Sequence, residues 1–180
     1  MNEEGSLPGG HVVSTVMANL GLDRFLQQNG MTMSRTQVGD RYVLEQMLES
    51  GSSLGGEQSG HTIFSDWSTT GDGTLTALKV VEVIQRTGKP LSELASSFVR
   101  YPQCLINVPV RSKPELDTVP QISEAIQQKE EALENNGRIL VRYSGTENKA
   151  RVMVECEDEK LCSKHAQDVA QIIEREIGAV

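Results

Sequence analysis

The chain has 180 residues, a formal net charge of −8 at pH 7, and hydrophobic and charged fractions of 37% and 23%. These fractions are those of a globular protein with one large or two small domains. An acidic chain does not suit nucleic acid or an anionic membrane surface, because both select basic surfaces. No apolar run approaches the roughly 20 residues that cross a bilayer, and the start lacks the features of a signal peptide. We therefore expect a cytoplasmic protein with neither kind of partner.

Three cysteines, Cys104, Cys156 and Cys162, are scattered along the chain. Their number is odd, and no two of them form a CxxC or another metal-type spacing. We expect reduced thiols and no metal site in this chain.

The first hundred residues alternate between strand and helix patterns. Hydrophobic periodicity and glycine stops predict a helix over 40–50 and a helix over 74–88 that is apolar on most faces and therefore well buried. The remaining segments are predicted as a strand at 12–18, a helix ending at Gly30, a strand at 31–38 and a β-rich stretch at 61–73. This alternation indicates an α/β domain.

The pattern changes near residue 101, where a second unit begins. A strand is predicted at 104–112, a helix at 121–136 stopped by Gly137, strands at 138–144 and 150–156, and a helix at 158–177. The fold prediction is therefore an α/β domain over 1–100 followed by a smaller α+β domain of β-α-β-β-α order over 101–180.

Two loops concentrate polar groups. The first is "LGGEQSGH", residues 54–61, which carries Glu57, Gln58, Ser59 and His61 between glycines that permit unusual backbone angles and close approach of a ligand. The second is "RYSGTENKAR", residues 142–151, whose arginines, hydroxyls and backbone N–H groups suit the oxygens of a phosphate. Each stretch taken alone also fits an ordinary polar turn.

An ordered set of motifs resembles a known family. The segments are "VVSTVMANLG", "VGDRYVLEQM", "LGGEQSGHTIF", "TTGDGTLTAL", "KPLSEL" and "GRILVRYSGTENKARVMVE", spanning residues 10–177. They resemble the C-terminal half of the phosphoglucosamine mutases, in the α-D-phosphohexomutase superfamily. The resemblance implies a mixed-sheet third domain and a small fourth domain of an isomerase that interconverts glucosamine 6-phosphate and glucosamine 1-phosphate for cell-wall precursor synthesis.

The resemblance also implies roles for individual residues. In the first loop Glu57 and Ser59 would bind hydroxyls of a phosphorylated hexosamine, Gly39 and Asp40 would lie near the ligand, and His61 would stabilise the loop or touch the sugar. In the second loop the phosphate ligands would be Arg142, Ser144, Gly145, Thr146 and Arg151, with Glu147 positioning an arginine.

Two loops of the family are absent from this sequence. The resemblance implies a phosphoserine in a "TASHNP"-like loop and magnesium held by a "DGDGDR"-type loop, and neither occurs here. "GDGT" at 71–74 offers only the carboxylate of Asp72, which is too few oxygen ligands for magnesium. We therefore expect part of a longer enzyme, inactive alone, whose N-terminal domains supply the nucleophile and the metal ligands.

A smaller departure lies in the second loop, where Tyr143 and Asn148 replace prolines of many relatives. Three alternatives stay open at this point. The chain could belong to a phosphomannomutase or phosphoglucomutase, it could be a non-catalytic phosphosugar-binding module, or it could be a structural interaction fragment.

Overall fold

The computed structural model describes residues 1, 4–96, 98–134 and 136–179. The chain forms two compact units, Met1–Arg100 and Tyr101–Val180, which are described separately. Among the described residues, no helix combines the length and the apolar character needed to span a membrane.

The first unit is built on a four-stranded mixed sheet of order β2-β1-β3-β4. The strands are β1 (His11–Thr15), β2 (Thr32–Thr36), β3 (Leu54–Gly56) and β4 (Thr62–Phe64), after a short 3-10 turn, η1 (Pro8–Gly10). β1 pairs in parallel with β2 and β3, and β3 pairs antiparallel with β4. The α/β prediction is confirmed, and the antiparallel β3–β4 hairpin is the element that presents the first polar loop.

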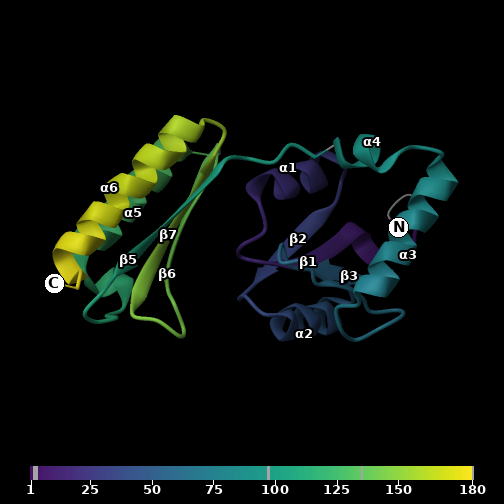
Figure 1. The fold of residues 1–180 in the computed structure, drawn as a ribbon, viewed down its shortest axis with the longest axis horizontal. Helices are drawn as coiled ribbons and strands as arrows, with labels where there is room; N and C mark the ends of the chain where they lie inside the picture. Colours follow the sequence, from purple (N-terminus) through teal and green to yellow (C-terminus); the bar gives the residue numbers. More distant parts are fainter. Residues whose placement is uncertain (2–3, 97, 135, 180) are drawn as a thin grey trace. The chain divides into compact units, whose positions relative to one another are not determined.

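Two helices flank this sheet on opposite sides (Figure 1), as connections between parallel strands require. They are α1 (Leu20–Gln28) and α2 (Asp40–Ser50). α2 has the predicted bounds and ends where Gly51 adopts a left-handed conformation, with φ of 70°. Val43 and Met47 of α2 are buried, whereas Tyr42 and Leu48 are exposed.

The predicted burial of the third helix is wrong. α3 (Gly73–Thr87) forms as expected, yet none of its described side chains is buried, and Leu78 and Val81 are 64% and 48% exposed. A hollow of about 930 Å³, lined largely by apolar side chains of the sheet, α3 and α4 (Leu91–Ser96), lies between α3 and the sheet. Val80 and Val83 of α3 line this hollow, whereas the exposed Leu78 and Val81 do not and lie on another part of the helix surface.

The second unit pairs a three-stranded antiparallel sheet with two helices that cover one of its faces (Figure 1). Its strands are β5 (Gln103–Pro109), β6 (Gly137–Tyr143) and β7 (Lys149–Cys156), in the order β5-β7-β6. Its helices are α5 (Pro120–Leu133) and α6 (Glu159–Ile177), and η2 (Leu116–Thr118) precedes α5. The β-α-β-β-α order agrees with the prediction.

The core of the second unit lies between the sheet and the helices. Its fully buried side chains include Ile122 of α5, Val152 of β7, and Val169 and Ile173 of α6. Two details differ from the prediction. α5 ends at Leu133, and Gly137 is the first residue of β6 instead of a helix stop, where a Cβ would lie 2.7 Å from the carbonyl oxygen of Glu155.

Candidate functional site

The first polar loop is the turn of the β3–β4 hairpin. The backbone N–H of Glu57 donates to the carbonyl of His61 at 2.8 Å, and the N–H of Gly60 donates to the carbonyl of Glu57 at 3.1 Å. Gly60 has φ of 101°, which other residues rarely adopt, so the turn depends on glycine there. Gly55 and Gly56 have another role, because a Cβ would lie within 2.8 Å of Met47 or Val43 at the first and of His61 at the second.

Glu57 connects this turn to the start of α2. Its Oε1 accepts a hydrogen bond of 2.9 Å from the backbone N–H of Gly39, whose φ is 137°. Its Oε2 lies 3.6 Å from Nδ1 of His61, and that same nitrogen lies 3.2 Å from Oγ of Ser59. The structure thus brings together four of the five residues proposed to contact the sugar.

The fifth residue does not join this cluster. Asp40 is exposed, and its Oδ1 accepts a hydrogen bond of 2.9 Å from the backbone N–H of the next residue, Arg41. This contact is a local arrangement at the start of α2. Nothing in it directs the Asp40 carboxylate toward Glu57.

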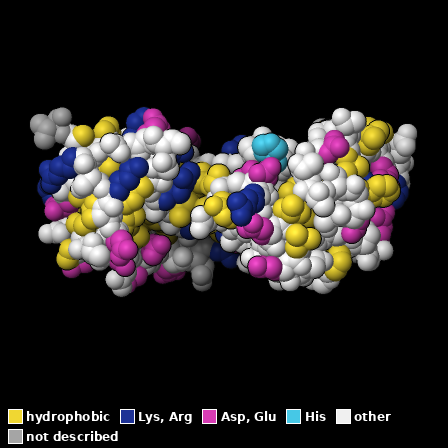
Figure 2. Space-filling model, turned by 90° about the horizontal axis from the view of Figure 1, so that it is seen from below, with side chains coloured by type: hydrophobic (Ala, Val, Ile, Leu, Met, Phe, Trp, Pro, Cys, Tyr) yellow, Lys and Arg dark blue, Asp and Glu magenta, His cyan; other side chains and the backbone are white. Residues whose placement is uncertain are grey.

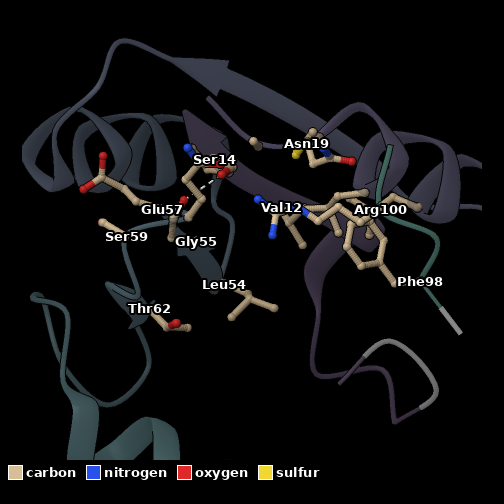
Figure 3. Close-up of a pocket in the computed structure, with 17 residues that line it drawn as sticks. Val12, Ser14, Asn19, Leu54, Gly55, Glu57, Ser59, Thr62, Phe98 and Arg100 are labelled. Carbon is tan, nitrogen blue, oxygen red and sulfur yellow. Dashed lines mark hydrogen bonds between the residues drawn. The ribbon is translucent and has the colours of Figure 1, made fainter. Parts of the chain in front are cut away.

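A pocket of about 740 Å³ opens beside the turn, as Figure 3 shows. Glu57 and Ser59 lie at one end, and Phe98 and Arg100 lie at the other. Gln58 also lines it, whereas Gly39 and His61 do not. Most of the wall is apolar. Arg100 lies in none of the family motifs, and Asn19 lies within the motif 12–21 but has no feature there that indicates a site.

The second polar loop joins β6 to β7. The two strands beside it carry one arginine each, and these arginines face each other. Arg142 on β6 pairs directly with Arg151 on β7, so two positive charges face each other across the ladder. Partial burial and, secondarily, the charge of Arg151 lower the pKa of Arg142. Like charges directly opposite each other destabilise a sheet, so this arrangement favours the binding of an anion between them.

The tip of this loop supplies hydrogen-bond groups. Ser144 is buried, its N–H donates to the carbonyl of Lys149 at 2.9 Å, and its hydroxyl accepts from the N–H of Glu147 at 3.3 Å. Nothing lies within 4 Å of a Cβ placed on Gly145, so the loop is open there. The structure therefore holds the predicted residues 142–151 in one hairpin.

Glu147 partly neutralises this cluster. Its carboxylate lies 2.7 Å from Nζ of Lys149 and 3.6 Å from an Nη of Arg151, and the hydrogen bond and charge of Lys149 lower the pKa of Glu147. Arg142 has no ion pair in the part of the chain that the structure describes, and the buried Nε of Arg151 has no hydrogen-bond partner there. In Figure 2 several Lys and Arg side chains lie on the visible face of this unit.

Asp72 and the three cysteines, which are residue types often found as metal ligands, do not form a metal site within the described residues. Asp72 caps α3, since its Oδ1 accepts a hydrogen bond of 2.9 Å from the N–H of Leu75. The three cysteines are free thiols, and burial raises the pKa of Cys162 to about 12. Within residues 1, 4–96, 98–134 and 136–179, no group of three or more His, Cys, Asp or Glu side chains could hold a metal ion.

Models of two protein domains match this chain. Residues 1–101 match the phosphoglucomutase/phosphomannomutase alpha/beta/alpha domain III, and residues 105–172 match the C-terminal domain of the same family. The chain belongs to the phosphoglucomutase/phosphomannomutase family. The predicted family is thereby confirmed.

Curated relatives support the same placement. The phosphoglucosamine mutase of Syntrophotalea carbinolica is 49% identical over 178 residues, covering 99% of this chain and 39% of that protein. The phosphoglucosamine mutase of Myxococcus xanthus is 51% identical over 167 residues, covering 93% of this chain and 36% of that protein. This chain thus spans less than half the length of these relatives.

Solved structures share the fold at low identity. One is Aspergillus fumigatus N-acetylphosphoglucosamine mutase, a serine-to-alanine variant in complex with glucose 1,6-bisphosphate, with a TM-score of 0.77, 20% identity, and coverage of 94% of this chain and 39% of that chain. The same enzyme in complex with GlcNAc-6P and magnesium gives a TM-score of 0.72, 18% identity, and coverage of 92% and 38%. These similarities confirm that the chain has the fold of the corresponding part of the phosphohexomutases.

Proposed function

We propose that this chain is the C-terminal part of a phosphoglucosamine mutase, which interconverts glucosamine 6-phosphate and glucosamine 1-phosphate in cytoplasmic cell-wall precursor (UDP-N-acetylglucosamine) synthesis. Identity near 49% over almost the whole chain supports this parent enzyme over a phosphomannomutase or phosphoglucomutase. Three free cysteines fit a reducing compartment. The role of this chain is to bind the substrate.

The opposed arginines carry the proposal. The phosphate that is not being transferred would bind Arg142 and Arg151, whose positive charges face each other across the strands, with the carboxylate of Glu147 3.6 Å from Arg151. A guanidinium binds phosphate oxygens with two parallel hydrogen bonds, and the hydroxyls of Ser144 and Thr146 and the N–H of Gly145 add neutral donors. We call residues 142–151 the phosphate clamp.

The turn of the first unit would bind the sugar. A sugar hydroxyl both donates and accepts, so the carboxylate of Glu57 with the hydroxyl of Ser59 can fix its orientation. Gly39 holds Glu57 in place, and His61 holds Ser59. Asp40 is the weakest member of the set, because its carboxylate is bonded locally.

The transfer chemistry would belong to parts of the enzyme outside this chain. The family resemblance assigns it to a phosphoserine and to magnesium, and the described residues offer no side-chain cluster that fits a metal. The chain holds the substrate, and holding reactants in position is a large part of the barrier reduction in phosphoryl transfer.

A titration of this chain tests the phosphate clamp. Inorganic phosphate or glucosamine 6-phosphate should move the backbone amide NMR signals of residues 144–148 before any others. Screening at physiological salt acts over about 8 Å, so the local arginines should outweigh the acidic charge of the whole chain. A single clamp leaves most of the ligand in water, and we expect a dissociation constant on the order of 1 mM.

Variants decide the outcome of this titration. Arg142→Ala combined with Arg151→Ala should abolish the shifts. Arg175→Ala, which removes an equally charged side chain that is 68% exposed, should leave them unchanged. Shifts that persist in the double variant, or that are largest in residues 54–61, would refute the phosphate clamp.

Activity measurements test the parent function. The 180-residue chain should show no mutase turnover in a coupled assay with glucosamine 6-phosphate, magnesium and a sugar bisphosphate, whereas the parent enzyme should turn over. In that enzyme Glu57→Ala should lower kcat/KM by about 10²-fold, roughly 3 kcal/mol. Turnover by the chain alone would refute the division of labour, and a higher kcat/KM with mannose or glucose phosphates would reassign the substrate.

A further inference from the structure

The segment that follows β5 contacts the phosphate clamp at two adjacent residues. Nζ of Lys113 donates a hydrogen bond of 2.7 Å to the carbonyl oxygen of Ser144. The hydroxyl of Tyr143 donates one of 2.8 Å to the carbonyl oxygen of Pro114. These bonds join residues 31 and 29 positions apart, so sequence spacing gave no sign of them.

The two bonds restrain the clamp where it leaves the sheet. Tyr143 is the last residue of β6, and its partner on β7 is Ala150. Beyond Tyr143, the N–H of Ser144 donates the next hydrogen bond across the hairpin, to the carbonyl oxygen of Lys149. A Cβ placed on Gly145 would have no neighbour within 4 Å. The clamp donates one of the two hydrogen bonds, from Tyr143, and accepts the other, at Ser144. Displacement of residues 143–144 from the segment therefore stretches both bonds.

The charges explain why such a restraint is useful. Arg142 and Arg151 repel each other across the strands, and without an anion this repulsion favours an opened or displaced hairpin. Lys113 forms no ion pair within the described residues, whereas Lys149 and Arg151 both lie near Glu147. The Lys113 ammonium therefore binds a backbone carbonyl and also adds positive charge beside the clamp.

We propose that Lys113 and Tyr143 are positioning residues that hold the phosphate clamp in its anion-binding conformation before the anion arrives. Holding a loop in its bound conformation lowers the entropic cost of binding. This inference rests on the proposed function of residues 142–151. It adds Lys113, which lies outside the family motifs, and Tyr143, which lies within one of them at a position where many relatives carry proline.

Two measurements on the 180-residue chain test the proposal. The first is amide hydrogen exchange of residues 143–149 in the absence of phosphate, and the second is the NMR titration with inorganic phosphate. The variants are Tyr143→Phe, which removes only the hydroxyl, Lys113→Met, which removes the ammonium, and Lys113→Arg, which keeps a donor and the charge.

Two control substitutions lie elsewhere in the second unit. Tyr101→Phe removes a hydroxyl that donates to Glu157 at 2.9 Å, and Lys160→Met removes an exposed ammonium on α6. Both controls should leave loop exchange and phosphate affinity unchanged. They separate loss of a hydroxyl or a charge in general from loss of these two bonds.

The expected result is faster exchange at residues 143–149 and a dissociation constant raised about three- to ten-fold in Tyr143→Phe and Lys113→Met. Lys113→Arg should bind phosphate with the affinity of the wild-type chain. Only Lys113→Met should also weaken the dependence of affinity on salt, because it alone removes a charge.

The outcomes separate the two proposals. If wild-type chain binds phosphate at residues 144–148 and both variants bind equally well with unchanged exchange, the positioning role is wrong and the clamp stands. If wild-type chain shows no shifts there, the clamp itself is wrong and the positioning role fails with it. Loss of affinity in Lys113→Arg as large as in Lys113→Met would also overturn the assignment of Lys113.

Discussion

The carboxylate of Glu57 accepts a hydrogen bond of 2.9 Å from the backbone N–H of Gly39, 18 residues earlier in the chain. This bond links the hairpin turn to the residue that precedes α2. Glu57 therefore has a structural role in addition to its proposed contact with the sugar, because its side chain is only 10% exposed.

Replacement of Glu57 should thus lower the stability of the first unit. A hydrogen bond to a charged group contributes about 1.5–3 kcal/mol, so Glu57→Ala should lower the free energy of unfolding by that amount, and Glu57→Gln by less. Urea denaturation followed by the fluorescence of Trp67, the single tryptophan, measures this. Glu45→Ala is the control, since Glu45 forms an exposed pair with Arg41. Equal urea midpoints for Glu57→Ala and Glu45→Ala would contradict the structural role.

Removal of Arg142 should affect binding and stability in opposite directions. Arg142→Met should abolish the phosphate-dependent shifts of residues 144–148. It should leave the free chain equally stable or more stable by up to about 1 kcal/mol, because a like-charge pair across β6 and β7 is lost. Urea unfolding followed by amide signals of β7 tests this. A loss of stability above that magnitude would show that Arg142 contributes to the fold.

Arg138, on the same strand, should behave differently. It forms a 2.5 Å ion pair with Glu155, which is fully buried and also accepts a hydrogen bond of 3.1 Å from Gln103. Arg138→Met leaves a buried carboxylate uncompensated and should cost about 3–5 kcal/mol. The double variant Arg138→Met with Glu155→Met should recover most of this loss. Similar stability of Arg138→Met and Arg142→Met would refute the distinction between the two arginines.

The buried thiol of Cys162 predicts a decrease in stability at alkaline pH. Burial raises its pKa from 9.0 to about 12, so the folded chain keeps a proton that the unfolded chain loses. The contribution of this thiol to the free energy of unfolding is fully present below pH 9. It falls by about 1.4 kcal/mol per pH unit as the pH rises toward 12. Cys162→Ala should show a shallower decrease over this window in urea unfolding followed by amide signals of β7. Parallel curves for the two proteins would contradict the assignment.

Local patterns in the sequence specify the secondary-structure elements and the family. α2 was predicted with its observed bounds because helical periodicity and the glycine stop act within a few residues. The family followed from motifs that are contiguous in sequence. The turn residues 57–61 and the hairpin residues 142–151 were identified in the same way, since their glycines, hydroxyls and charges are close together in the chain.

Which of these residues act together depends on tertiary packing. The Glu57–Gly39 bond, the Arg142–Arg151 register and the Lys113–Ser144 bond each depend on strand pairing and packing between distant segments, which local patterns do not specify. The sequence does not predict the exposure of α3 for the same reason. The spacing of its apolar residues predicts a helix, but whether they are buried depends on what packs against them. In this structure Val80 and Val83 line a hollow, and Leu78 and Val81 are exposed.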